Sequence, residues 1–168
     1  MSAAGYDYRR ASAFHRIGRR IASTRLAARL YPLMQARADR VVFRISRGRS
    51  TLTSWVGGMP VVMLTTSGAK SGRLRTLPVL GLLEGDRVIL IASNYGRPRN
   101  PAWYHNLRAN PRASIAIDGQ AREVEARELS GIERDHYYQR GIEMYPGFEH
   151  YREWAGERQI PVIELSPV

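Results

Sequence analysis

The chain has 168 residues with no cysteine, 43% of them are hydrophobic, and its formal net charge is +11. This length is typical of one domain with a substantial core, and the lack of cysteine excludes disulfides and thiolate chemistry. Residues 1–50 carry 12 arginines and two aspartates, whereas the rest of the chain holds 14 basic and 13 acidic residues. The excess charge therefore lies outside the globular body, and we expect no nucleic-acid partner.

Three further classes are disfavoured by the sequence. The four histidines have no metal-binding spacing, so we expect no metal site. The sequence contains neither an apolar run of roughly 20 residues nor the continuous apolar core of a signal peptide, so we expect a cytoplasmic protein.

Residues 14–47 have hydrophobic side chains near helical spacing, with arginines filling much of the rest and an interruption expected at Pro32. This pattern predicts a basic amphipathic helical leader over residues 1–54, followed by a domain over 55–168. One interpretation is peripheral contact with an anionic membrane, at the inner face of the plasma membrane. The other is a helix that packs on the domain and leaves its arginines in water. The pattern leaves both open.

The remaining chain alternates short β-branched runs with turns. It predicts strands over 60–66, 73–84, 86–93, 112–118, 120–130 and 160–165, a short helix over 101–110, and a helical stretch over 131–157 interrupted at Pro146 and Gly147. Glu84-Gly85-Asp86 and Asp118-Gly119 are typical hairpin turns. Hairpin-joined strands with helices outside the run predict an α+β, mainly β fold with an antiparallel barrel.

The stretch TTSGAKSGRLRT, residues 65–76, joins the first two predicted strands and contains Lys70, the chain's one lysine. Ala69 stands where a nucleotide-hydrolysis loop requires glycine, and a strand follows instead of a helix, so that function is excluded. Glycines that orient backbone amides, with Lys70, Ser71, Arg73 and Arg75, are suited to binding a phosphate. A solvated basic turn is the alternative.

A second unusual cluster, ASNYGRPRNPAWYHNLRANP, occupies residues 92–111. It leaves a predicted strand through a polar turn and enters the short helix at Pro101, with aromatic and hydrogen-bonding residues in the first helical turn. Trp103 and Leu107 alone would indicate a helix anchored to the barrel. Together with the basic loop, the cluster favours a flat cofactor that carries phosphate.

These two motifs and the closing IPVIEL resemble the deazaflavin-dependent nitroreductase and quinone reductase family, over about residues 55–166. Its members are actinobacterial oxidoreductases with a split β-barrel, of the FMN-binding split-barrel type, that use the 8-hydroxy-5-deazaflavin coenzyme F420. The resemblance implies coenzyme contacts at Ala69, Lys70, Ser71, Arg73, Arg75, Thr76, Pro78, Ala92, Ser93, Asn94, Tyr95, Gly96, Ala102, Trp103, Tyr104, His105 and Asn106. Many members carry a second basic residue at the position of Ala69, so weaker binding of the acidic tail is expected.

The resemblance also implies a substrate pocket formed by Ser93, Tyr145, Phe148 and Tyr151. Phe148 lacks the hydroxyl of the tyrosine common in nitroimidazole-reducing members, which argues against nitroimidazole reduction. The spacing of three is equally typical of a helix face packed on the barrel. Hydride transfer is the coenzyme's own chemistry, so no catalytic base is required.

We therefore expect an F420H2-dependent oxidoreductase, a monomer or homodimer, whose small-molecule acceptor is a quinone or, secondarily, a nitroaromatic. Two alternatives are an oxidoreductase of the same barrel class that binds FMN, and a non-catalytic binder of a deazaflavin or apolar ligand at the membrane.

Overall fold

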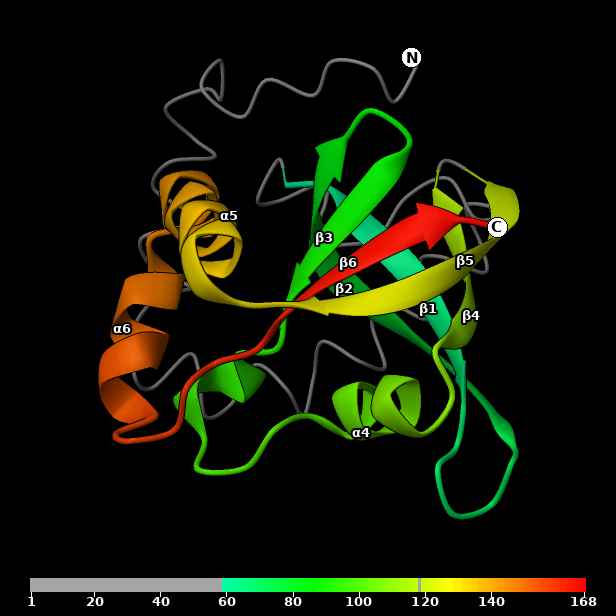
Figure 1. The fold of residues 1–168 in the computed structure, drawn as a ribbon, viewed down its shortest axis with the longest axis horizontal. Coiled ribbons are helices and arrows are strands. Elements are labelled where there is room, and N and C mark those ends of the chain that lie inside the picture. Colours follow the sequence, from blue (N-terminus) through cyan, green and yellow to red (C-terminus); the bar gives the residue numbers. More distant parts are fainter. Residues whose placement is uncertain (1–58, 118) are drawn as a thin grey trace.

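The structure, a computed structural model, describes residues 59–117 and 119–168 (Figure 1). The predicted leader over residues 1–54, its interruption at Pro32 and its membrane contact lie outside the described residues. The boundary at 54/55 lies outside them as well.

The described residues form strands and three α-helices in the predicted order, and a short 3-10 helix occurs where a polar turn was expected. The strands are β1 (Val61–Ser67), β2 (Leu74–Glu84), β3 (Arg87–Ile91), β4 (Arg112–Ile117), β5 (Gln120–Leu129) and β6 (Val162–Pro167). The helices are η2 (Asn94–Gly96), α4 (Ala102–Ala109), α5 (Gly131–Met144) and α6 (Gly147–Trp154). The predicted hairpin at Glu84-Gly85-Asp86 is confirmed, since Glu84 pairs with Arg87.

The strands close into an antiparallel barrel in the order β1-β2-β3-β6-β5-β4, which confirms the predicted mainly β fold (Figure 1). Three neighbouring pairs are hairpins, namely β1 with β2, β2 with β3, and β4 with β5. The other pairs join strands distant in sequence, and β6 inserts between β3 and β5. The barrel is thus closed by long-range pairing.

Strand β3 explains why the hydrophobic residues divide into two clusters. Successive side chains of a strand point to opposite faces. Val88 and Leu90 belong to the cluster inside the barrel, whereas Ile89 and Ile91 belong to the cluster under α5 and α6. Because both faces are covered, the strand is apolar from Val88 to Ile91 instead of alternating.

Two groups of helices cover different parts of the barrel (Figure 1). Helix α4 lies at the end where β1 turns into β2, and its Trp103 and Leu107 join the interior cluster. Helix α5 packs beside β3 and β6, and α6 packs on α5 and on η2. The predicted interruption of the helical stretch is confirmed, because α5 ends at Met144 and α6 begins at Gly147, around Pro146.

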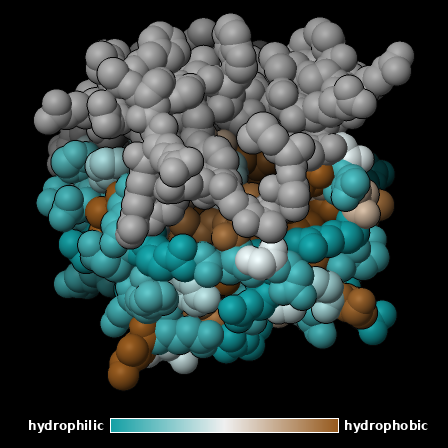
Figure 2. All heavy atoms as spheres, turned by 90° about the horizontal axis from the view of Figure 1, so that it is seen from above, coloured by the Kyte–Doolittle hydropathy of each residue, from teal (hydrophilic) through white to brown (hydrophobic). Residues whose placement is uncertain are grey.

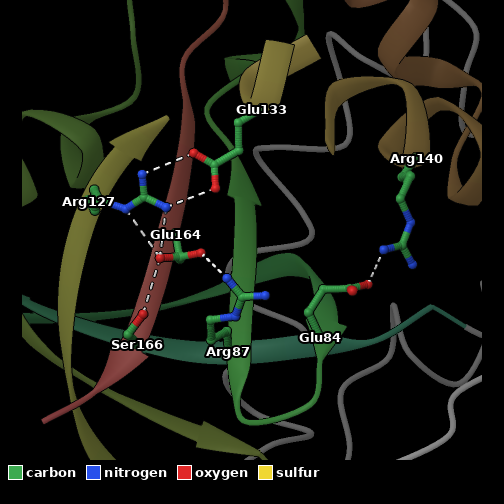
Figure 3. Close-up of polar contacts among 7 residues, drawn as sticks. All are labelled: Glu84, Arg87, Arg127, Glu133, Arg140, Glu164 and Ser166. Carbon is green, nitrogen blue, oxygen red and sulfur yellow. Dashed lines mark hydrogen bonds and ion pairs between the residues drawn. The ribbon is translucent and has the colours of Figure 1, made fainter. Parts of the chain in front are cut away.

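Charged side chains fasten α5 to the barrel (Figure 3). Glu164 of β6, only 5% exposed, accepts hydrogen bonds from Arg87 at 2.7 Å and from Arg127 at 3.2 and 3.3 Å. Arg127 also donates two bonds to Glu133 of α5, at 2.9 and 3.0 Å, and these bonds raise the pKa of Arg127. The charge of this nearly buried carboxylate is compensated by two arginines, so loss of either arginine should be destabilising.

On the face seen in Figure 2, hydrophilic residues cover most of the visible described surface, with hydrophobic residues in smaller patches. Among the described residues, the exposed large hydrophobic side chains are Leu74 of β2, Ile132 of α5 and Val168 after β6. Single hydrophobic residues of this kind are ordinary on a globular surface. Within residues 59–117 and 119–168, no helix combines the length and hydrophobicity needed to cross a bilayer.

Candidate functional site

The basic stretch of residues 65–76 forms a tight loop between β1 and β2. The Gly68 amide donates to the Arg73 carbonyl at 2.9 Å, and the Gly72 amide donates to the Gly68 carbonyl at 2.8 Å. Gly72 has a φ of +64°, which favours glycine. Since these amides have partners within the loop, an anion would be held mainly by side chains. Those of Lys70, Ser71, Arg73 and Arg75 are all exposed.

Asn106 of α4 joins this loop to the helix. Its Oδ1 accepts the Ala69 amide at 3.0 Å, and its Nδ2 donates to Oγ1 of Thr66 at 2.9 Å. Asn106 is 9% exposed and Thr66 is 1% exposed, so both groups need these bonds. The two motifs singled out in the sequence are therefore brought together by one buried amide side chain.

Thr76 and Pro78 lie on β2, next to the basic loop. The hydroxyls of Thr65 and Thr76 are 2.8 Å apart across the β1–β2 pair. Pro78 is half-buried opposite Met63.

The polar turn after β3 has an unusual backbone. Asn94, Tyr95 and Gly96 all have positive φ, at 48°, 58° and 71°. A Cβ on Gly96 would lie 2.8 Å from the Trp154 Cβ and 3.0 Å from the Tyr151 carbonyl oxygen, so the turn packs directly on α6. Ala92 and Ser93, which precede it, are buried. Non-glycine residues with positive φ are uncommon and recur at ligand-binding sites.

The side chain of Arg158, in the segment between α6 and β6, holds this turn through hydrogen bonds to its backbone. Arg158 donates to the carbonyl oxygen of Ser93 at 2.7 Å, that of Arg97 at 3.0 Å and that of Ala92 at 3.4 Å, and to Oδ1 of Asn100 at 2.6 Å. Burial lowers the pKa of its guanidinium. The strand end and the approach to α4 are thus held by one cation.

The first turn of α4 separates into buried and exposed residues. Trp103 and Tyr104 are 6% and 5% exposed and pack in the barrel interior, whereas Ala102 and His105 face outward. The Tyr104 hydroxyl donates to the Glu128 carboxylate at 3.1 Å, and burial followed by this hydrogen bond raises the pKa of Tyr104. The two rings therefore anchor the helix, while Ala102 and His105 lie on its exposed side.

The three C-terminal aromatics form one buried cluster. Tyr145, Phe148 and Tyr151 are each 4% exposed, and the hydroxyls of Tyr145 and Tyr151 are 3.1 Å apart. Tyr151 also meets the ring of Tyr95 edge-on, with ring centroids 5.9 Å apart. The predicted pocket residues therefore adjoin the turn that follows Ser93, and they are packed in the core in this structure.

This end of the barrel is electropositive by sequence. Segments 68–76 and 93–112 contain seven exposed basic residues and no acidic one: Lys70, Arg73, Arg75, Arg97, Arg99, Arg108 and Arg112. The acidic turn residues Glu84 and Asp86 lie in the β2–β3 hairpin, at the opposite end of β2 from the loop. Glu128, which accepts the Tyr104 hydroxyl, is an acidic residue beside these segments, and the excess of basic side chains there favours anionic ligands.

Sequence reasoning missed Arg158, Asn100 and Glu128. Arg158 is one of many arginines, and its main acceptors are backbone carbonyls, which leave no trace in the sequence. Glu128 lies on β5, whose sequence contains no recognisable functional motif. Arg158 precedes β6, and the long-range pairing of β6 with β3 brings it to the strand end at Ala92.

Comparisons with known proteins identify the family of this chain. A family model described as F420H(2)-dependent quinone reductase matches residues 34–167. Rv3178 of Mycobacterium tuberculosis (strain ATCC 25618 / H37Rv), whose name carries the same description, is 37% identical over 109 residues, or 65% of this chain and 91% of the relative. Rv1261c of the same strain, named F420H(2)-dependent quinone reductase, is 32% identical over 112 residues, or 66% of this chain and 75% of the relative.

Two solved structures are similar over most of their length. One is described as an F420-H2 dependent reductase, with a TM-score of 0.59 and 37% identity, covering 64% of this chain and 94% of that chain. The other is described as a domain-swapped dimer, with a TM-score of 0.61 and 34% identity, covering 76% of this chain and 95% of that chain.

Proposed function

Because the chain belongs to the F420H(2)-dependent quinone reductase family, and is thus an oxidoreductase that uses coenzyme F420, we propose that it holds the coenzyme at the α4 end of the barrel and reduces a quinone there. The observation that carries this proposal is the Thr66–Asn106–Ala69 link, because it joins the basic loop to the polar helix start in one rigid unit. A coenzyme with a flat ring and a long anionic tail needs both parts, the basic loop for its tail and the helix start for its ring.

The donor set fits the anionic tail. Lys70 and Arg73 are exposed on the loop and Arg75 is exposed at the start of β2, and segments 68–76 and 93–112 contain no acidic residue. Phosphate and carboxylate groups accept charge-assisted hydrogen bonds from such side chains, each contributing about 1.5–3 kcal/mol where water is excluded. Ala69 offers no side-chain donor and is held by Asn106, so its part is to set the shape of the loop.

The ring would lie along Pro78 and the segment Ala92–Gly96, beside the start of α4. Here the chain's task is to present fixed backbone groups and keep water out, and the positive-φ turn packed on α6 is suited to both. When bound, the reduced coenzyme supplies a hydride. Asn106, with Ala102 and His105 on the exposed side of the helix, borders the same space.

The acceptor would be bounded by Ser93 and the aromatic cluster of Tyr145, Phe148 and Tyr151. A quinone that gains a hydride also gains a proton to become a hydroquinone. The hydroxyls of Tyr145 and Tyr151, 3.1 Å apart in this structure, would have to separate to admit the acceptor, and one of them would then donate that proton. The hydrophobic surroundings of these hydroxyls suit an apolar ring.

Fluorescence titration of F420 tests the coenzyme site. In the double variant Lys70→Ala, Arg75→Ala we expect the Kd for F420 to rise on the order of 100-fold, since two charge-assisted contacts are lost. The matched control, Arg122→Ala, Arg152→Ala, removes the same charge from β5 and α6 and should bind within about twofold of wild type. An unchanged Kd in the loop variant would remove the loop from the site.

Steady-state oxidation of F420H2 tests the acceptor. We expect menadione to give a higher kcat/KM than a nitroimidazole of similar size, because Phe148 lacks a hydroxyl to bind the nitro group. Faster turnover of the nitroimidazole would refute the quinone assignment while leaving the coenzyme site intact.

The oligomeric state follows from neither the sequence nor the single chain. We propose a homodimer, supported by the similar structure described as a domain-swapped dimer. Light scattering that gave the mass of one chain would contradict it.

A further inference from the structure

Arg158 makes an unusual set of contacts for an arginine. Its guanidinium donates to three backbone carbonyls and one side-chain amide oxygen, spread over the segment from Ala92 to Asn100. All four acceptors are neutral. The positive charge of this half-buried side chain is therefore not offset at these contacts, as it would be in an ion pair.

The segment that Arg158 holds is the one proposed to line the coenzyme ring. This segment consists of the strand end at Ala92 and Ser93, the positive-φ turn, and the residues that lead to α4. These three parts run in different directions. The short bonds from Nη2 to the Ser93 carbonyl, at 2.7 Å, and from Nη1 to Asn100, at 2.6 Å, fix the two ends of this segment relative to each other. A planar fork with several donors can do this, whereas a lysine ammonium cannot match the geometry.

We propose that Arg158 is the positioning residue of the coenzyme site: it fixes the backbone of residues 92–100 in the shape that receives the ring, and its unbalanced charge favours an anionic ligand there. This inference rests on the proposed function, because it takes the ring to lie along that segment. Arg158 contacts the backbone of this segment and is not proposed to contact the coenzyme.

Arg134 supplies the matched control. It is likewise a half-buried arginine that donates to a backbone carbonyl, that of Ile160, at 2.8 Å, and its guanidinium lies over the Tyr138 ring at 4.6 Å. It differs in that it pairs with Asp135 at 2.7 Å and makes no bond to residues 92–100 among its described contacts. Its loss should affect stability but not the coenzyme site.

The test compares Arg158→Lys, Arg158→Ala and Arg134→Ala in the full chain, measuring the melting temperature and the Kd for F420 by fluorescence. We expect all three variants to lose a few degrees in melting temperature. Only the Arg158 variants should bind F420 more weakly, by about 10-fold for lysine, which keeps the charge, and about 100-fold for alanine. Added guanidinium ion should restore part of the affinity of Arg158→Ala and none of any loss in Arg134→Ala.

The proposal is overturned if Arg158→Lys and Arg158→Ala both bind F420 as wild type does, or if Arg134→Ala weakens binding equally. If the alanine variant does not fold, the lysine variant alone decides, by the same criterion. Failure of the proposed coenzyme site would appear differently, as normal affinity in the Lys70→Ala, Arg75→Ala protein.

Discussion

Replacing Asn106 with alanine should destabilise the folded chain by about 2–4 kcal/mol. The variant loses two hydrogen bonds, each contributing about 1 kcal/mol, to the Ala69 amide and the Thr66 hydroxyl. Ala69 is exposed, so water can replace its partner. Thr66 is 1% exposed, so its hydroxyl is left without this donor in the core, which adds about 1–2 kcal/mol.

Replacing Asn106 with aspartate should weaken coenzyme binding by its charge. The carboxylate can accept from both the Ala69 amide and the Thr66 hydroxyl, and these bonds offset part of the cost of burying it at a position that is 9% exposed. It also places a negative charge next to the basic loop. At a separation of about 10 Å and an effective dielectric constant of about 20, repulsion of one coenzyme anion costs about 1–2 kcal/mol, or roughly a 10-fold increase in the Kd for F420.

Urea unfolding and F420 titration measure the two effects on the same proteins. Asn110→Ala is the matched control, because this exposed asparagine one helical turn away accepts only the local Arg112 amide at 3.1 Å, and we expect a change within about 0.5 kcal/mol. If Asn106→Asp bound F420 as tightly as wild type, the loop that Asn106 contacts would not face the coenzyme, and the reasoning would be refuted.

Gly96→Ala should destabilise the fold by about 2–4 kcal/mol in urea unfolding, because it strains a φ of +71° and overlaps α6; a smaller loss would mean that the turn does not pack tightly. Tyr138→Phe should cost about 1 kcal/mol at pH 7, since it removes the bond to the Phe148 carbonyl at 2.8 Å. Burial raises the pKa of Tyr138 to about 12, so wild type loses stability as pH rises from 10 towards 12 and the variant's deficit should shrink over that window; a constant deficit would contradict this sign. Tyr145→Phe combined with Tyr151→Phe should lower kcat for menadione about 10-fold or more with F420 affinity unchanged, and equal turnover would remove both hydroxyls from the reaction.

The local parts of the fold were predictable from the sequence because each has a short-range cause. Alternation and β-branched runs gave the strands, the Glu84-Gly85-Asp86 turn gave a hairpin, and Pro146 gave the break between α5 and α6. The insertion of β6 between β3 and β5 was not predictable in this way. Both faces of β3 are buried, so its hydrophobicity does not reveal which strand pairs with it.

In the candidate site, too, the local features were predictable from the sequence and the long-range contacts were not. The loop around Lys70 and the start of α4 could be identified because their residue types are unusual for a turn and a helix. Asn106 was named through resemblance, but its role in holding the loop depends on a contact across 37 residues. Arg158 was not identified at all, since its acceptors are main-chain carbonyls that any sequence possesses.

The position of β6 has a consequence for the order in which the molecule assembles. The local hairpins can form early, but Val88 pairs with Leu165 across 77 residues, and closing so long a loop is entropically costly and slow. Arg158 lies just before β6, so its bonds to residues 92–100 form when that last strand docks. Before the barrel closes, the chain would therefore lack the conformation of residues 92–100 that Arg158 fixes. Coenzyme binding would then become possible only late in folding.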